Sequence, residues 1–361
     1  MPFALIVLTE PDAGPTWIGP AASMLAFLLG GAGLHTVQTA GLALATDLSN
    51  EKTRPQVVAL LYVMLLVGMI VSSLGFSALL EDFNYVRLIK VIQGAAVITL
   101  VLNVIALWKQ EAMQPHLTLP DRIRPAFRET WREFSQSQRT FRLLVAVGLG
   151  TAGFSMQDIL LEPYGGEILG LSVSATTLLT ALWAAGALVG FALAGKRLAA
   201  GSNAYRLAGA GLVAGIWAFS LVIFSAPMSS PALFYLGATL IGFGGGLFAV
   251  ATLTAAMTMP ASGNAGRGLA LGAWGAAQAT AAGVSIALGG TLRDWIGSAA
   301  MSGNMGEALA SPATGYSFVY HTEIGLLFVT LVILGPLVRQ SGPLTPTESG
   351  SRPMGLADFP T

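Results

Sequence analysis

Asp158 and Glu162 are four residues apart, which is the spacing that places two side chains on one face of a helix. Glu167 follows five residues later. Carboxylates gathered near one helix end could relay protons or meet a cationic surface of a partner protein. They could equally form structural ion pairs, for which Arg87 and Lys90 are the cations expected at the same membrane level. The pattern therefore predicts an acidic cluster and leaves its role open between these two interpretations.

A second group of charges surrounds a short polar turn. Asp47 and Arg54 flank this turn, and Arg267 has the position that matches Arg54 in a later copy of the same pattern. Opposite charges around such a turn can latch neighbouring helices and favour one conformation. We therefore interpret these three residues as a structural latch that does not touch substrate.

Residue types that catalyse reactions or bind metals are scarce in the rest of the chain. The 361 residues include 18 Lys and Arg, 18 Asp and Glu, three His and no Cys. Without cysteine there are no disulfides and no thiolate ligands. We find no metal-ligand cluster, nucleotide motif or catalytic constellation, so we expect neither an enzyme nor a metal site. The balanced charge gives no reason to expect a nucleic-acid partner.

The elements that must position these residues are transmembrane helices. Hydrophobic residues make up 54% of the chain and charged residues only 10%, against about 25% charged residues in a soluble domain. A helix crosses the hydrocarbon layer in roughly 20 apolar residues. We find nine such runs, preceded by a shorter apolar stub, Pro2–Leu8. The runs are Ile18–Ala45, Val57–Leu80, Leu88–Trp108, Phe141–Leu161, Val173–Ala194, Leu207–Ser225, Ala232–Met257, Gly268–Gly290 and Phe318–Val338.

The basic residues predict the orientation of the chain. If the Asp47–Pro55 turn is cytoplasmic, 15 of the 18 Lys and Arg residues fall on the cytoplasmic side. Because cytoplasmic loops carry an excess of Lys and Arg, we expect a multi-pass protein of a bacterial inner membrane with a cytoplasmic C-terminus. Asp158, Glu162 and Glu167 then lie toward the periplasmic end, and the latch residues on the cytoplasmic side.

Among the ionisable residues, His35 is the one that we expect near the middle of the membrane. An ionisable group there is costly and is therefore a functional candidate. Gln38 is one turn away from it, and Gln278 is near the centre of a later run. The competing interpretation is that these side chains hydrogen-bond neighbouring helices. The glycine-rich stretch Gly242–Gly246 is best explained by close helix packing.

An internal repeat predicts two parallel halves. A shift of 213 residues places Arg54 on Arg267, and Leu80–Phe83 then falls on Leu292–Trp295 after a slip of one residue. Each copy contains a helix, an Arg-bearing turn, a second helix and an acidic exit. We expect residues 1–108 to be the remainder of an N-terminal half, 109–140 a cytoplasmic linker with an amphipathic helix, 141–340 a six-helix half and 341–361 a disordered tail. On this register the stub is half a helix, and two to three N-terminal helices, roughly 70 residues, are missing.

Two stretches resemble a known family. They are Gly33–Met69, with the sequence GLHTVQTAGLALATDLSNEKTRPQVVALLYVMLLVGM, and Gln157–Trp183, which contains LEPYGGE. Both are similar to the PucC/LhaA family of phototrophic bacteria, and the resemblance extends from the stub to the last helix. It implies a major-facilitator-like bundle of about nine transmembrane helices and a partial one. It also implies a role in assembling light-harvesting complexes, with antenna polypeptides and pigment-synthesis enzymes as partners.

The resemblance also makes bacteriochlorophyll a candidate cofactor. Gly31 is one turn before His35, and a small residue at that distance leaves room for a flat macrocycle whose magnesium the imidazole would ligate. Gln38 and Gln278 complete the candidate pigment or substrate site. The alternative function is a proton-coupled transporter of a small solute or a tetrapyrrole.

Overall fold

The computed structural model describes residues 54–108, 137–257, 266–303 and 305–340, together with 21–22, 24–26, 29–33, 36–37 and 41. Within these ranges the regular elements are α-helices and short 3-10 helices, and no strand occurs. The predicted all-α class is therefore confirmed.

Eight long helices match the second to ninth predicted apolar runs. Their bounds are α3 Arg54–Leu79, α4 Tyr85–Leu107, α6 Gln138–Ser155, α8 Val173–Ala199, α9 Ala204–Ser225, α10 Pro231–Met257, α11 Gly266–Met301 and α12 Ala313–Gln340. Among the described residues, six spans are long and apolar enough to cross a membrane; they comprise α4, α8, α9, α10, α12 and the segment Gln138–Glu167. In the first predicted run, the part that the structure describes includes a short apolar helix over Met24–Gly33.

The chain forms two compact units. One contains Met1–Leu65 and Gly75–Arg122, and the other contains Leu66–Leu74 and Ile123–Thr361. In the first unit α4 begins at an N-cap, Asn84, whose side chain accepts a hydrogen bond from the Arg87 backbone N–H. None of the residues of α4 is buried.

Local polar residues define the helix ends of the second unit. Asn203 caps α9 by accepting hydrogen bonds from the backbone N–H groups of Tyr205 and Arg206. Gly201, with φ +81°, follows α8 and allows the Ser202 N–H to reach back to the Arg197 carbonyl. This left-handed glycine cap satisfies carbonyl groups that the helix end would leave free.

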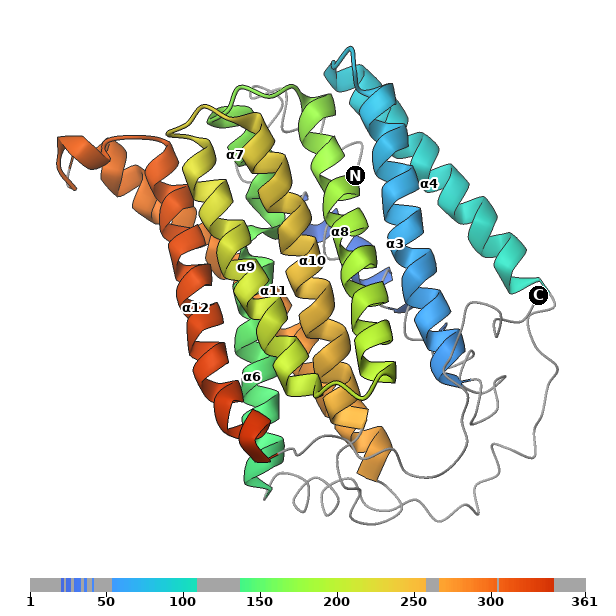
Figure 1. The fold of residues 1–361 in the computed structure, drawn as a ribbon. Coiled ribbons are helices and arrows are strands. Elements are labelled where there is room, and N and C mark those ends of the chain that lie inside the picture. Colours follow the sequence, from blue (N-terminus) through green and yellow to red (C-terminus); the bar gives the residue numbers. More distant parts are fainter. Residues whose placement is uncertain are drawn as a thin grey trace. The chain divides into compact units, whose positions relative to one another are not determined.

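Glycines hold α10 tightly between α8 and α9, as Figure 1 shows for these neighbouring helices. A Cβ atom on Gly242 would meet the Trp183 carbonyl oxygen of α8, and one on Gly244 would lie 2.7 Å from the Gly211 carbonyl oxygen of α9. Small residues let helix backbones approach closely in membranes. The packing role predicted for Gly242–Gly246 is therefore confirmed.

The interior of the second unit is aromatic on the side where α12 packs against α6, α9 and α11. Tyr164, Tyr316, Tyr320, Phe219 and Phe234 are all almost completely buried. The ring of Tyr164 lies 5.4 Å from that of Tyr316 and 5.5 Å from that of Tyr320, both edge-on. These rings form a tightly packed aromatic cluster in the core of the unit.

Two predicted elements differ in the structure. The run Phe141–Leu161 is not one helix, because α6 ends at Ser155, a 3-10 helix η2 covers Met156–Ile159, and α7 covers Leu161–Glu167. Helix α11 continues through Leu292–Trp295 to Met301, whereas its repeat copy ends at Leu79 before a turn. The segments that follow these two helices differ. In the first copy Asn84 is the N-cap of the next helix, and the second copy has no such residue at the matching position.

Some predictions lie outside the described residues. They include the amphipathic linker helix, most of the linker itself and the tail 341–361. The proposed domain boundaries therefore stay predictions.

Candidate functional site

The break between α6 and α7 brings polar groups into the interior of the second unit. Leu160 N–H donates to the Gln157 carbonyl at 2.8 Å, a 3-10 contact that replaces regular helical pairing. Helix α11 approaches this break closely, because a Cβ on its Gly289 would lie 2.6 Å from the Met156 carbonyl oxygen. In a membrane every backbone group that a break releases needs another partner.

Glu323 of α12 supplies that partner. The backbone N–H of Gln157 donates to Glu323 Oε1 at 2.8 Å. The Gln157 side chain donates through Nε2 to the Phe154 carbonyl at 3.1 Å and to Asp158 Oδ1. Glu323 is completely buried and Gln157 is 1% exposed. A carboxyl group of α12 thus fastens the broken helix in place.

Three buried polar atoms next to this contact have no hydrogen-bond partner in the described part of the chain. They are Glu323 Oε2, Gln157 Oε1 and Tyr320 Oη. We call Gln157, Tyr320 and Glu323 the helix-break cluster. A buried carboxyl group with a free oxygen can bind or release a proton, and unsatisfied polar atoms of this kind call for a specific explanation.

A second polar group ties the end of α7 to α11 and α12. Glu167, the last residue of α7, accepts hydrogen bonds at Oε2 from Arg293 Nη2 at 2.5 Å and from the Tyr316 hydroxyl at 2.8 Å. Arg293 also pairs with Asp294 at 2.8 Å, and its guanidinium lies 4.4 Å from the centre of the Tyr316 ring. We call Glu167, Arg293 and Tyr316 the α7 end tie.

The predicted acidic residues have separate partners in the structure. Asp158 is in η2 and accepts from Gln157, while Glu162 is in α7 and accepts from Thr180 Oγ1 at 3.3 Å. Glu167 is the last residue of α7, and its partner is Arg293. The 3-10 break changes the angular offset between positions 158 and 162, so the regular helical spacing does not apply.

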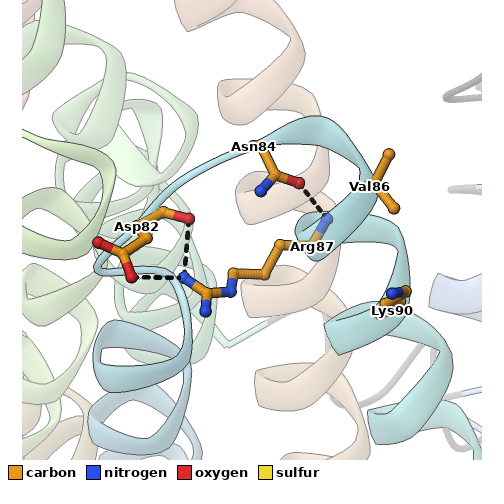
Figure 2. Close-up of a pocket in the computed structure, with 5 residues that line it drawn as sticks. All are labelled: Asp82, Asn84, Val86, Arg87 and Lys90. Carbon is orange, nitrogen blue, oxygen red and sulfur yellow. Dashed lines mark hydrogen bonds and ion pairs between the residues drawn. The ribbon is translucent and has the colours of Figure 1, made fainter.

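The cations considered for this cluster are at the turn between α3 and α4. An open pocket of about 550 Å³ lies at this turn. Figure 2 shows the residues that line it: Asp82, Asn84, Val86, Arg87 and Lys90. Arg87 pairs there with Asp82 at 3.2 Å and also donates to the Asp82 carbonyl. Both side chains are exposed, so the ion pair between Arg87 and Asp82 contributes little to the stability of the turn.

The remaining candidate residues are only partly described. His35, Gln38 and Asp47 lie outside the described residues. Gly31 is half-buried in the first helix, and Gln278 is half-buried in α11. Arg54 and Arg267 stand at the first turn of α3 and α11, respectively, which agrees with their repeat positions, although their side chains are not described. The pigment site and the latch stay predictions.

Sequence reasoning missed Glu323, although the signal was present. Glu323 is near the middle of α12, within the predicted run Phe318–Val338, and His321 is in the same run. The expectation that His35 alone is ionisable near the midplane is therefore wrong. The same rule that selected His35, an ionisable residue within an apolar run, selects these two residues as well. The sequence contains no such signal for Arg293, because its partner, Glu167, is 126 residues away.

Comparison with known proteins gives one consistent result. A family model described as "PUCC protein" matches residues 1–342. A protein of the puhA-bchM intergenic region of Rhodobacter capsulatus is 54% identical over all of this chain and 76% of its own length. Protein PucC of Cereibacter sphaeroides is 46% identical over 94% of this chain and 73% of its own. The bacteriochlorophyll synthase 44.5 kDa chain of R. capsulatus is 28% identical over 89% of this chain and 73% of its own.

One solved structure has the same fold. It is a bacterial homologue of the human lysosomal transporter Spinster in an inward-facing, unoccupied conformation. The TM-score is 0.59 at 17% identity, over 85% of this chain and 76% of that one. The likeness confirms the major-facilitator-like architecture of a multi-pass membrane protein, and at this identity it shows the fold alone.

Proposed function

Because this chain belongs to the PucC family, we propose that it assists the assembly of light-harvesting complexes in the inner membrane of a phototrophic bacterium. The match of the family model over residues 1–342 carries this proposal. The partners would be antenna polypeptides, with pigment-synthesis enzymes nearby, and the protein would act without catalysing a reaction.

The structure of the second unit supports this role. A single-helix partner in the lipid would meet the outer surface of this unit. That surface carries large exposed apolar side chains, including Trp217 and Phe224 on α9 and Leu236 on α10. Single-helix antenna polypeptides would contact such a surface through helix packing in the lipid.

The test is the near-infrared absorption spectrum of membranes from a strain in which the gene is deleted. We expect loss of one antenna band while free bacteriochlorophyll is still made, and recovery of the band when the gene is returned on a plasmid. An unchanged spectrum in a strain without a second family member would overturn the proposal.

A second candidate function is proton-coupled transport, and the helix-break cluster is the observation that favours it. A completely buried Glu323 with one free oxygen is the kind of group that exchanges protons in carriers. Purified protein in liposomes with an internal pH dye would test this. Substrate-dependent acidification that Glu323→Gln abolishes would support transport, and its absence for small solutes and tetrapyrroles would reject it.

A further inference from the structure

Glu323 is a carboxyl group in the interior of the second unit, and no positive charge among the described residues pairs with it. It is ten residues, about 15 Å, from the first residue of α12, so it lies inside the hydrocarbon layer of a membrane that this helix crosses. The side chain is completely buried and forms no ion pair in the described part of the chain. An isolated carboxylate in such a place is very costly, so it needs a proton or another cation.

The charged groups of the neighbouring helices do not supply that cation. Helix α12 packs against α6, α9, α11 and η2. In η2, Asp158 is within electrostatic range of Glu323 and is itself acidic. In α11, Arg293 is bonded to Glu167 and to the Tyr316 hydroxyl. The described arginines of α6 and α9 are all close to the first residues of those helices: Arg139, Arg142 and Arg206. The balancing charge therefore has to come from solution.

Glu323 and the neighbouring Gln157 each carry a buried oxygen atom that has no partner in the described chain. The Gln157 backbone N–H donates to Glu323 Oε1 at 2.8 Å, which places Gln157 against the carboxyl group. The unpartnered atoms are Glu323 Oε2 and Gln157 Oε1. A carboxylate and an amide oxygen can only accept hydrogen bonds, so they cannot satisfy each other. A water molecule could donate to both but would leave the charge unbalanced, whereas a small cation meets both needs.

The rest of the helix-break cluster and the end of α6 add further oxygen atoms. Tyr320 is three residues before Glu323, a spacing that places both on one side of α12, and its buried hydroxyl has no described partner. Helix α6 ends at Ser155, and the carbonyl groups at the C-terminal end of a helix attract cations. The ends of broken helices coordinate Na⁺ and protons in membrane carriers. These groups are all oxygen ligands, which suit a hard cation.

We propose that the helix-break cluster binds one small monovalent cation, a proton or Na⁺, between Glu323 Oε2 and Gln157 Oε1. A proton on Oε2 would donate to the amide oxygen, and Na⁺ would coordinate both oxygens together with the Tyr320 hydroxyl. These three side-chain oxygens are fewer than the six or more ligands that divalent Ca²⁺ and Mg²⁺ take. The bound cation would stabilise the break between α6 and α7, because it fastens Gln157 to α12.

The experiment measures the midpoint of thermal unfolding of the purified protein in detergent, with NaCl replacing choline chloride at constant ionic strength. At about pH 8.5 we expect about 150 mM Na⁺ to raise the wild-type midpoint by at least about 3 °C, or acidification to about pH 6 without Na⁺ to do so. The first result assigns Na⁺ to the site, and the second assigns the proton. Glu323→Gln should lose the response, because its side chain is uncharged at every pH and still accepts the Gln157 N–H.

Two further variants control the measurement. Glu307→Gln removes an exposed carboxyl group ahead of α12 without touching the cluster, and it should respond as the wild type does. Gln157→Met keeps the backbone N–H and the bulk of the side chain but removes the amide oxygen. It should raise the cation concentration for half of the response by at least about threefold, and it tests the site even where Glu323→Gln fails to fold. His321, on the same helix, titrates in this pH range as well, but its contribution persists in Glu323→Gln.

Several results would overturn the proposal. They are a wild type that responds neither to Na⁺ nor to acid, equal responses of the wild type and Glu323→Gln, loss of the response in Glu307→Gln, and a wild-type response in Gln157→Met.

The cation site does not rest on the proposed role in assembly, and the two can be separated. A cation-dependent midpoint with an unchanged antenna spectrum after gene deletion would leave the site and reject the assembly role. Loss of an antenna band with no cation response of the purified protein would leave the assembly role and reject the site. A cation response without substrate-dependent acidification of liposomes would leave the site and reject proton-coupled transport.

Discussion

Glu323 has two oxygens with different surroundings, and substitutions can separate their roles. Oε1 accepts the backbone N–H of Gln157, and Oε2 has no described partner. Glu323→Gln retains an acceptor oxygen of the same shape, whereas Glu323→Leu leaves the Gln157 N–H unsatisfied in the interior. We expect Glu323→Leu to lower the free energy of unfolding by about 1–3 kcal/mol and Glu323→Gln by less than about 1 kcal/mol. Unfolding by denaturing detergent, followed by circular dichroism, measures both. Equal losses in the free energy of unfolding would mean that the hydrogen bond to Glu323 Oε1 does not stabilise the helix break.

The α7 end tie should contribute less, because it is partly exposed. The side chains of Arg293 and Glu167 are 29% and 51% exposed, so water and salt screen their attraction. A double-mutant cycle with Arg293→Gln and Glu167→Gln should give a coupling energy of about 0.2–1 kcal/mol at low salt. The coupling should fall further at 1 M salt. A coupling that is unchanged by salt would show that hydrogen bonds to Tyr316, not charge, hold the tie.

How much of the site could be predicted from the sequence depends on how far apart its residues are along the chain. Ionisable residues within apolar runs can be found from the sequence, so His35, His321 and Glu323 were all within reach. Pairings such as Glu167 with Arg293 or Gln157 with Glu323 join segments 126 and 166 residues apart. No local pattern specifies which helices meet, so these contacts could not be predicted.

At the scale of the helix, the sequence predicted positions well and interruptions poorly. Eight apolar runs correspond to described helices because burial in lipid requires long apolar segments. The break at Met156–Ile159 was missed although Pro163 signals it. Proline has no N–H to donate to the carbonyl four residues earlier, that of Ile159, and its ring clashes with that carbonyl, so a regular helix cannot run through this turn. The Glu323 carboxyl group and the close approach of Gly289 then hold the break in place.

Two glycines of α8 provide a matched test of helix packing. A Cβ on Gly186 would overlap the Thr239 carbonyl oxygen of α10, whereas one on Gly195 would meet nothing within 4 Å. Backbone cannot move aside cheaply, so Gly186→Ala should destabilise the protein by at least about 1–3 kcal/mol. Gly195→Ala should be neutral or stabilise it by up to about 1 kcal/mol. The two variants are compared by their midpoints of thermal unfolding in detergent. Similar midpoints would mean that α8 and α10 are not as close as the structure shows.

At the scale of the whole molecule, the orientation in the membrane stays a prediction from the distribution of Lys and Arg. Helix α9 tests it, because its two ends should lie on opposite sides. Arg197 precedes α9 near its predicted cytoplasmic end, and Met228 follows it near the predicted periplasmic end; both are exposed. The chain has no cysteine, so a single introduced thiol reports its own position without background.

We expect a membrane-impermeant maleimide to label Met228→Cys in spheroplasts, which expose the periplasmic face of the inner membrane. Arg197→Cys should be labelled only after the membrane is broken. The reverse pattern would place the C-terminus in the periplasm.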